Sequence, residues 1–166
     1  INIYFIGNYF YKMIEEKNKQ INSILRDCEN ALTNLTANLE TINSISLAAD
    51  RIIKSLESGS KIFACGNGGS MADSMHFCEE LSGKFRKDRK GLAAISISDP
   101  CYLTCVANDY GYENVFSRFL ESNAKGGDIL FAISTSGSSL NILNAARYAK
   151  QNSINVITLT GKVNSE

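Results

Sequence analysis

Five hydroxyl side chains surround a single glycine at residues 134–139, which read Ser-Thr-Ser-Gly-Ser-Ser. Hydroxyl groups and backbone N–H groups at the start of a helix can bind a phosphate group without a charged side chain, because that end of a helix carries partial positive charge. A turn followed by a helix cap would explain one or two of these hydroxyls, but not five. The segment therefore predicts a phosphate site.

A second candidate for chemistry lies on the segment 70–82, where Asp73, His76 and Glu80 recur at spacings of three and four residues. On a helix these side chains share one face. His76 and Glu80 could together transfer a proton or bind a divalent metal ion. The same spacing is typical of an exposed polar stripe, so both interpretations stay open. The opposite face, which we expect to pack against the core, carries Met71, Met75, Cys78 and Ser82.

A glycine-rich loop, residues 65–70, precedes this helix and reads Cys-Gly-Asn-Gly-Gly-Ser. Its glycines allow a sharp turn and the close approach of a ligand, and we expect Ser70 to cap the helix together with Asp73. The loop matches neither the GxGxxG pattern nor the GxxxxGK[ST] pattern of nucleotide sites. We therefore expect no nucleotide cofactor. In the polar loop 107–112, Asp109 could bind the hydroxyls of a sugar, although an ordinary turn explains the same residues.

The elements that must position these residues follow from short apolar runs that alternate with helical patterns. The runs lie at 61–65, 92–97, 129–133 and 155–159. Helices are predicted at 13–38, 41–57, 70–82, 102–108, 114–123 and 138–151. Such runs are typical of strands buried on both faces of a parallel sheet, so the predicted fold class is α/β, a three-layer α-β-α sandwich. Ligands bind such sheets beyond the carboxyl ends of the strands, where both loops fall.

The 166 residues suffice for one globular domain. We expect residues 1–12 to be an extension upstream of it, because a charged helical pattern starts at Met13. Residues 13–166 would form a single domain, with a helical arm at 13–59 and an α/β core at 60–166. The last predicted strand has no following helix to cover it, so we expect the core to be incomplete at its C-terminal end.

Composition excludes several classes of protein. Seventeen Lys and Arg residues balance seventeen Asp and Glu residues, which argues against a protein that binds nucleic acid mainly through its phosphates. No apolar run approaches the roughly 18 residues of a membrane span, and the start lacks the pattern of a signal peptide. Five cysteines without a CxxC pair favour buried, reduced thiols in a cytosolic protein. We expect a cytoplasmic protein with neither nucleic-acid nor membrane partners.

Taken together, five segments resemble the bacterial phosphoheptose isomerases of the SIS (sugar isomerase) domain superfamily, in the family's order and between about residues 20 and 162. They are Gly66–Ser70, Met75–Gly83, Asn108–Gly111, Ile133–Ser139 and Ile157–Lys162. The resemblance implies an aldose–ketose isomerase that converts sedoheptulose 7-phosphate to D-glycero-D-manno-heptose 7-phosphate through an enediol, for the heptose precursors of lipopolysaccharide or capsule. It also implies a cytoplasmic homotetramer, with residues 13–59 as the oligomerisation arm.

The resemblance also implies a role for each matching residue. Glu80 would be the base that moves a proton between C1 and C2, with His76 as the other catalytic residue. Where family members carry one zinc ion per subunit, His76 and Glu80 would be its ligands. The phosphate would be held by Ser134, Thr135, Ser136 and Ser139. The sugar site would be lined by Asn67, Gly68, Ser70 and Asp109.

The sequence departs from the family pattern at its C-terminal end. The family's second acid, a histidine, and a glutamine come from a C-terminal helix that these 166 residues do not contain, and the fifth strand is missing as well. His76 and Glu80 alone cannot make a closed zinc site. An alternative is a non-catalytic SIS protein that binds a sugar phosphate, or a protein partner as the replication-initiator-associating relatives do; Glu80 favours the enzyme. A six-carbon or amino-sugar phosphate stays open as substrate, because no feature of the sequence specifies how many carbons the sugar has.

Overall fold

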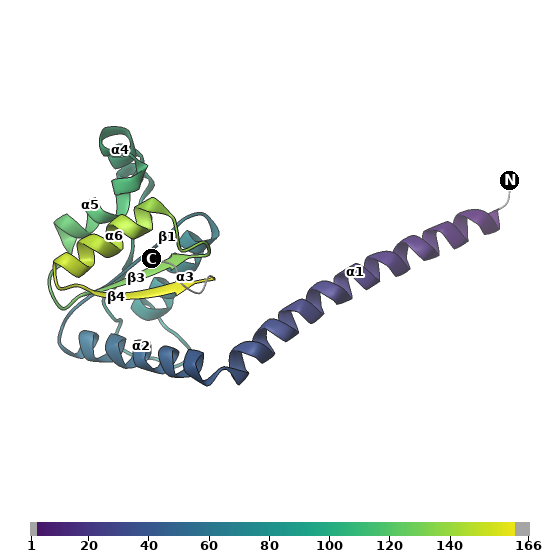
Figure 1. Cartoon of the computed structure of the whole chain (residues 1–166), viewed down its shortest axis with the longest axis horizontal. Coiled ribbons are helices and arrows are strands. Elements are labelled where there is room, and N and C mark those ends of the chain that lie inside the picture. The colour runs from purple at the N-terminus through teal and green to yellow at the C-terminus, as the bar shows by residue number, and fades with distance from the viewer. Residues whose placement is uncertain (1–2, 162–166) are drawn as a thin grey trace. The chain divides into compact units, whose positions relative to one another are not determined.

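The fold is seen in a computed structural model of the chain, which describes residues 3–161 (Figure 1). The chain divides into two compact units, residues 1–47 and 48–166. Among the described residues, no helix combines the length and the apolar composition needed to cross a membrane. Lys162, the last residue of the five family-like segments, lies outside the described residues.

The first unit is helical. Helix α1 (Ile3–Ala37) is 35 residues long and begins ten residues before the start that we expected at 13, which is therefore wrong. Extending an existing helix costs little, and residues 3–12 contain no proline to stop it. Helix α2 (Leu39–Glu57) begins after Asn38, whose Oδ1 accepts a hydrogen bond from the Thr41 N–H at 3.0 Å. This is an N-cap, and it separates the two helices.

The second unit is built on a four-stranded parallel sheet in the order β2-β1-β3-β4. Its strands are β1 (Ile62–Gly66), β2 (Ala94–Ser96), β3 (Ile129–Ser134) and β4 (Asn155–Thr160). The central strands pair so that Gly66 lies opposite Ile133. The glycine-rich loop after β1 and the serine-rich loop after β3 therefore leave the sheet side by side.

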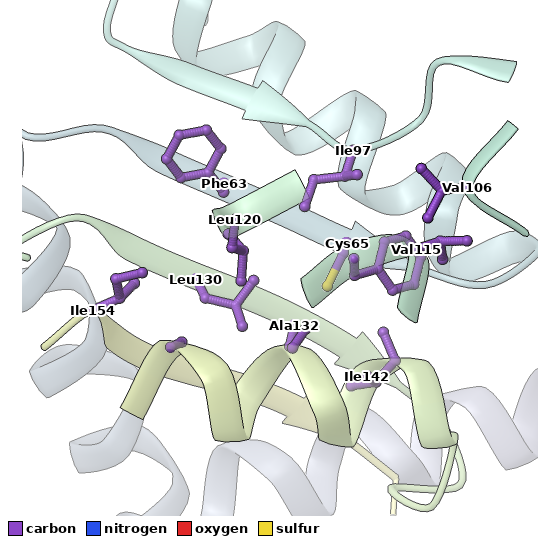
Figure 2. Close-up of a cluster of buried hydrophobic side chains, with 13 residues drawn as sticks. Phe63, Cys65, Ile97, Val106, Val115, Leu120, Leu130, Ala132, Ile142 and Ile154 are labelled. Carbon is purple, nitrogen blue, oxygen red and sulfur yellow. The ribbon is translucent and has the colours of Figure 1, made fainter. Parts of the chain in front are cut away.

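Helices cover both faces of the sheet, which confirms the three-layer α/β fold. One face packs against α4 (Pro100–Tyr110), α5 (Val115–Asn123) and α6 (Leu140–Gln151). Figure 2 shows this core, in which Phe63 and Leu130 of the strands meet Leu120 of α5 and Ile142 of α6. The other face packs against α3 (Gly69–Ser82) and the end of α2, through Cys78, Ile52 and Leu56. A 3-10 helix, η1 (Tyr112–Asn114), links α4 to α5.

Three expectations about individual elements need correction. The outer strands are not buried on both faces, because they form the sheet edges: Ile95 of β2 and Leu159 of β4 are exposed. The core face of α3 carries Ser74 and Cys78, whereas Met75 is half exposed. Helix α3 already begins at Gly69, with Gly68 as its N-cap and no side-chain cap, so Ser70 and Asp73 do not cap it.

The cysteines differ from the expectation as well. Cys65 and Cys78 are buried free thiols, but Cys28, Cys101 and Cys105 are exposed. Burial raises the pKa of the Cys65 thiol to about 12 and that of the Cys78 thiol to about 11. These two thiols are therefore parts of the core rather than reactive groups.

Candidate active site

A small polar pocket lies where the loops after β1 and β3 meet; we call it the serine pocket. It has a volume of about 190 Å³. Its lining consists of Asn67, Ser70, Ile133, Ser134, Thr135, Ser136 and Ser139. None of these seven side chains is charged. The structure thus brings together six of the eight residues that the resemblance assigned to substrate binding.

The serine loop is held by its own hydrogen bonds. Ser134 Oγ accepts the Gly137 N–H at 3.2 Å and donates to Ser139 Oγ at 3.5 Å, and Ser136 Oγ accepts the Ser138 N–H at 3.2 Å. Gly137 has a φ of 67°, which favours glycine. Gly161 N–H donates to the Thr135 carbonyl oxygen at 3.2 Å and ties the loop to the end of β4. The hydroxyls of Ser134, Ser136 and Ser139 are therefore held within the loop that borders the pocket.

The serine pocket also borders the start of α6. Ser139 is the N-cap residue of α6, but its hydroxyl makes no capping hydrogen bond. The first N–H groups of a helix lack partners within the helix, and the helix dipole adds partial positive charge there. A neutral pocket with hydroxyls and a helix N-terminus suits an anion with several acceptor oxygens, such as a phosphate.

Two residues that the sequence analysis missed contact Asn67, which lines the pocket. The side-chain amides of Asn67 and Asn141 form a reciprocal pair, with N–O distances of 3.0 Å and 2.8 Å. The Tyr112 hydroxyl donates to Asn67 Oδ1 at 3.0 Å. Tyr112 and Asn141 lie 45 and 74 positions from Asn67 in the sequence. No local pattern could have identified these contacts.

His76 and Glu80 lie in a different place, along α3, in a hollow of about 580 Å³ that we call the α3 hollow. It is lined by Asp73, His76, Phe77, Glu80, Leu81, Phe85, Arg89 and Leu92. His76 Nε2 lies 3.3 Å from Glu80 Oε1; the His76 side chain is 74% exposed and that of Glu80 33%. Arg89 donates to the Glu80 and Leu81 carbonyl oxygens, both at 2.7 Å, and so ties the loop after α3 to its end.

The potential metal ligands on α3 include Glu79 beside His76 and Glu80. His76, Glu79 and Glu80 each offer a ligand atom, and these atoms lie within 4.8 Å of one another. One imidazole nitrogen and two carboxylates form a donor set that zinc accepts. The residues therefore fit a metal site with three protein ligands.

The serine pocket and the α3 hollow do not merge within one chain. Ser70 and Glu80 are ten residues apart on α3, which corresponds to a rise of about 15 Å. Asp109 also lies outside the serine pocket: it is exposed near the end of α4, and its Oδ1 accepts from Asn108 Nδ2 at 2.8 Å. Gly68 is exposed beside Asn67 and does not line the pocket.

Comparison with known proteins identifies the family. The family model of the SIS domain matches residues 12–161. A phosphoheptose isomerase of Cytophaga hutchinsonii is 53% identical over 140 residues, which are 84% of this chain and 73% of that protein. The chain belongs to the phosphoheptose isomerase family. A phosphoheptose isomerase of Tolumonas auensis is 53% identical over 134 residues, which are 81% of this chain and 70% of that one.

Solved structures of the family have the same fold. A phosphoheptose isomerase from Neisseria gonorrhoeae matches with a TM-score of 0.80 at 34% identity, over 86% of this chain and 74% of that one. One from Francisella tularensis matches with a TM-score of 0.82 at 34% identity, over 87% and 75%. The resemblance inferred from the sequence is thereby confirmed, and with it the enzyme class of aldose–ketose isomerases.

Proposed function

We propose that the chain converts sedoheptulose 7-phosphate to D-glycero-D-manno-heptose 7-phosphate, moving a proton between C1 and C2 through an enediol. The reaction would serve the cytoplasmic synthesis of heptose precursors of lipopolysaccharide or capsule. The observation that carries the proposal is the serine pocket, a neutral, hydroxyl-lined pocket at a helix N-terminus in a member of the phosphoheptose isomerase family.

The serine pocket would hold the phosphate end of the substrate. Its volume of about 190 Å³ is below the roughly 300–1,000 Å³ typical of sites that enclose a whole small molecule, so it fits one end of a heptose phosphate. Ser134, Thr135, Ser136 and Ser139 would donate hydrogen bonds to phosphate oxygens. Because the phosphate does not react, this binding energy positions the distant carbons C1 and C2.

Glu80 would be the base that moves the proton, with His76 beside it. Its carboxylate is partly shielded in the α3 hollow, between apolar side chains such as Phe77 and Leu81. A carboxylate within hydrogen-bond reach of C1 and C2 can take a proton from one carbon and return it to the other. Asn67, Gly68, Ser70 and Asp109 would bind the sugar hydroxyls between the two ends.

The proposal includes a homotetramer. Within one chain the serine pocket and Glu80 lie about 15 Å apart along α3, so a second subunit that brings its Glu80 to the serine pocket would complete the site. The first unit offers a surface for such association, because several large apolar side chains of α1 are exposed. They include Ile14, Ile21, Ile24, Leu25, Leu32 and Leu35.

We further propose that His76 and Glu80 are ligands of one zinc ion per subunit, with Glu79 within reach of the same ion. Held by these residues, zinc would supply Lewis-acid chemistry toward the oxygens of the substrate. This chain's own contribution would be to hold the imidazole and the carboxylate on one face of α3, four residues apart.

The experiment that tests the proposal is incubation with sedoheptulose 7-phosphate in D₂O, with and without added zinc, followed by NMR. We expect conversion to the aldose with deuterium at C2, because an enediol exchanges its proton with solvent. A parallel reaction with fructose 6-phosphate tests whether the protein also accepts a six-carbon ketose phosphate. Calorimetric binding of sedoheptulose 7-phosphate without conversion under either condition would instead support the non-catalytic alternative.

A further inference from the structure

We propose that Tyr112 and Asn141 are positioning residues that lock the side-chain amide of Asn67 with its N–H group toward the serine pocket, so that Asn67 binds an acceptor oxygen of the ligand. The proposal deepens the proposed function and rests on it for the identity of the ligand. It concerns two residues that neither the sequence nor the family resemblance assigned to the site.

The orientation of Asn141 is set by the backbone. Asn141 Oδ1 accepts the Ile142 N–H at 3.0 Å. A backbone N–H can only donate, so the end of the amide that faces it must be the oxygen. Asn141 is 3% exposed, and a flipped amide would place two buried donors against each other at an energetic cost. Its NH₂ group therefore faces Asn67.

The fixed amide of Asn141 in turn fixes that of Asn67. Asn141 Nδ2 donates to Asn67 Oδ1 at 2.8 Å, and Asn67 Nδ2 donates to Asn141 Oδ1 at 3.0 Å. The Tyr112 hydroxyl occupies the second acceptor position of Asn67 Oδ1 at 3.0 Å. Asn67 Nδ2 keeps one hydrogen without a partner among the described residues. Because Asn67 lines the serine pocket, this hydrogen is the donor that it offers to a ligand.

Tyr112 is itself held in place by α6. It begins η1, which follows Gly111 at a φ of 85°. Asn144 Nδ2, one turn into α6, donates to the Glu113 carbonyl oxygen at 3.0 Å and ties η1 to that helix. Both partners of Asn67 are thus fixed to the helix whose N-terminus borders the serine pocket. The site gains a pre-oriented N–H donor, which suits a phosphate or hydroxyl oxygen and disfavours a donor group.

The first test compares Tyr112→Phe with Tyr110→Phe. Both tyrosines are about half exposed, at 50% and 52%, and the Tyr110 hydroxyl has no hydrogen-bond partner among the described residues. Loss of one hydrogen bond that orients Asn67 should weaken binding of sedoheptulose 7-phosphate and of inorganic phosphate about two- to tenfold, and should raise KM more than it lowers kcat. Tyr110→Phe should leave binding unchanged, and equal effects of the two substitutions would overturn the proposal.

A double-mutant cycle separates positioning from a purely structural role. In an Asn67→Ala background, Tyr112→Phe should cause no further loss of affinity, because the group that it orients is gone. Full additivity would overturn the proposal. In an ¹⁵N NMR spectrum, Tyr112→Phe should shift the side-chain amide signals of Asn67, and Tyr110→Phe should not. Asn141→Asp, which removes the donor to Asn67 Oδ1, should weaken binding more than Tyr112→Phe does. If the Asn141→Asp variant fails to fold, the results for Tyr112→Phe still test the proposal.

Two separate measurements test the positioning role of Tyr112 and the isomerase activity: coupling in phosphate binding and turnover of sedoheptulose 7-phosphate. Coupling between Tyr112 and Asn67 in phosphate binding, without turnover of sedoheptulose 7-phosphate, would support the positioning role and contradict the isomerase. Turnover with no such coupling would support the isomerase and overturn the positioning role.

Discussion

The backbone of Gly66 lies directly against the backbone of Ser70, and a Cβ atom on Gly66 would overlap the Ser70 carbonyl oxygen. Gly66 is the buried last residue of β1, and Ser70 is in the first turn of α3. This close approach lets the chain turn from strand to helix within a few residues. It is also what places the Ser70 side chain in the serine pocket.

Gly66→Ala should lower the free energy of unfolding by about 1–3 kcal/mol, because the added methyl group meets backbone that must shift. Gly69→Ala is the matched control, since a Cβ atom there has no neighbour within 4 Å and alanine favours a helix over glycine by up to about 1 kcal/mol. Urea unfolding of both variants measures the difference. Equal stability of the two would contradict the close approach of Gly66 to Ser70.

The general architecture could be predicted because its signals are local. Short apolar runs marked all four strands, and a parallel sheet brings the loops after β1 and β3 to the same edge. The composition of those loops indicated a polar site there, and the serine pocket lies at that place. The sequence did not show which residues of the two strands lie opposite each other. The structure supplies this register, in which Gly66 lies opposite Ile133.

Features that depend on tertiary context could not be predicted. The spacing of His76 and Glu80 identified a shared helix face, but not that this face lines a hollow separate from the serine pocket. The exposure of β2 and β4 follows from their place at the sheet edges, which apolar composition alone does not reveal. The pairing of Asn67 with Asn141 joins residues 74 positions apart, and it needed the folded chain.

Ser136→Ala combined with Ser139→Ala should weaken the binding of phosphorylated ligands selectively. Two lost hydrogen bonds to a charged group correspond to about 3–6 kcal/mol, so a loss of affinity of about 100-fold or more is expected. Calorimetry with sedoheptulose 7-phosphate and with unphosphorylated sedoheptulose measures the selectivity. Ser138→Ala removes an exposed hydroxyl of the same loop outside the pocket lining and should have little effect. Equal losses for both sugars would argue against a phosphate site.

Alkylation with iodoacetamide at pH 8 should modify three of the five cysteines of the native protein. Cys28, Cys101 and Cys105 are exposed. Cys65 and Cys78 are buried, and burial raises the pKa of their thiols to about 12 and about 11, so almost no thiolate forms at that pH. Peptide mapping by mass spectrometry identifies the labelled positions, and all five should react in urea. Rapid native labelling of Cys65 would show that the core of β1 is open to solvent.

Glu80→Gln should lower kcat at least about 100-fold, because an amide cannot accept the proton that an enediol mechanism transfers. Binding of sedoheptulose 7-phosphate should change little, since the serine pocket, which we propose holds the phosphate, is intact. Glu121→Gln, which neutralises an exposed carboxylate on α5, is the control and should retain activity. An NMR assay of the conversion and calorimetry of binding separate the two effects. Unchanged turnover in Glu80→Gln would exclude Glu80 as the base.

The distance between Glu80 and the serine pocket leads to a final prediction about mixtures of inactive variants. If a site combines the serine pocket of one subunit with Glu80 of another, subunit exchange between Glu80→Gln and the Ser136→Ala, Ser139→Ala double variant should restore part of the wild-type activity. Some mixed sites then contain an intact pocket from the first variant and an intact Glu80 from the second. Size-exclusion chromatography verifies that both variants assemble. Assembled mixtures that stay inactive would mean that each subunit must supply both parts, and the roughly 15 Å rise along α3 would then have to be bridged within one chain.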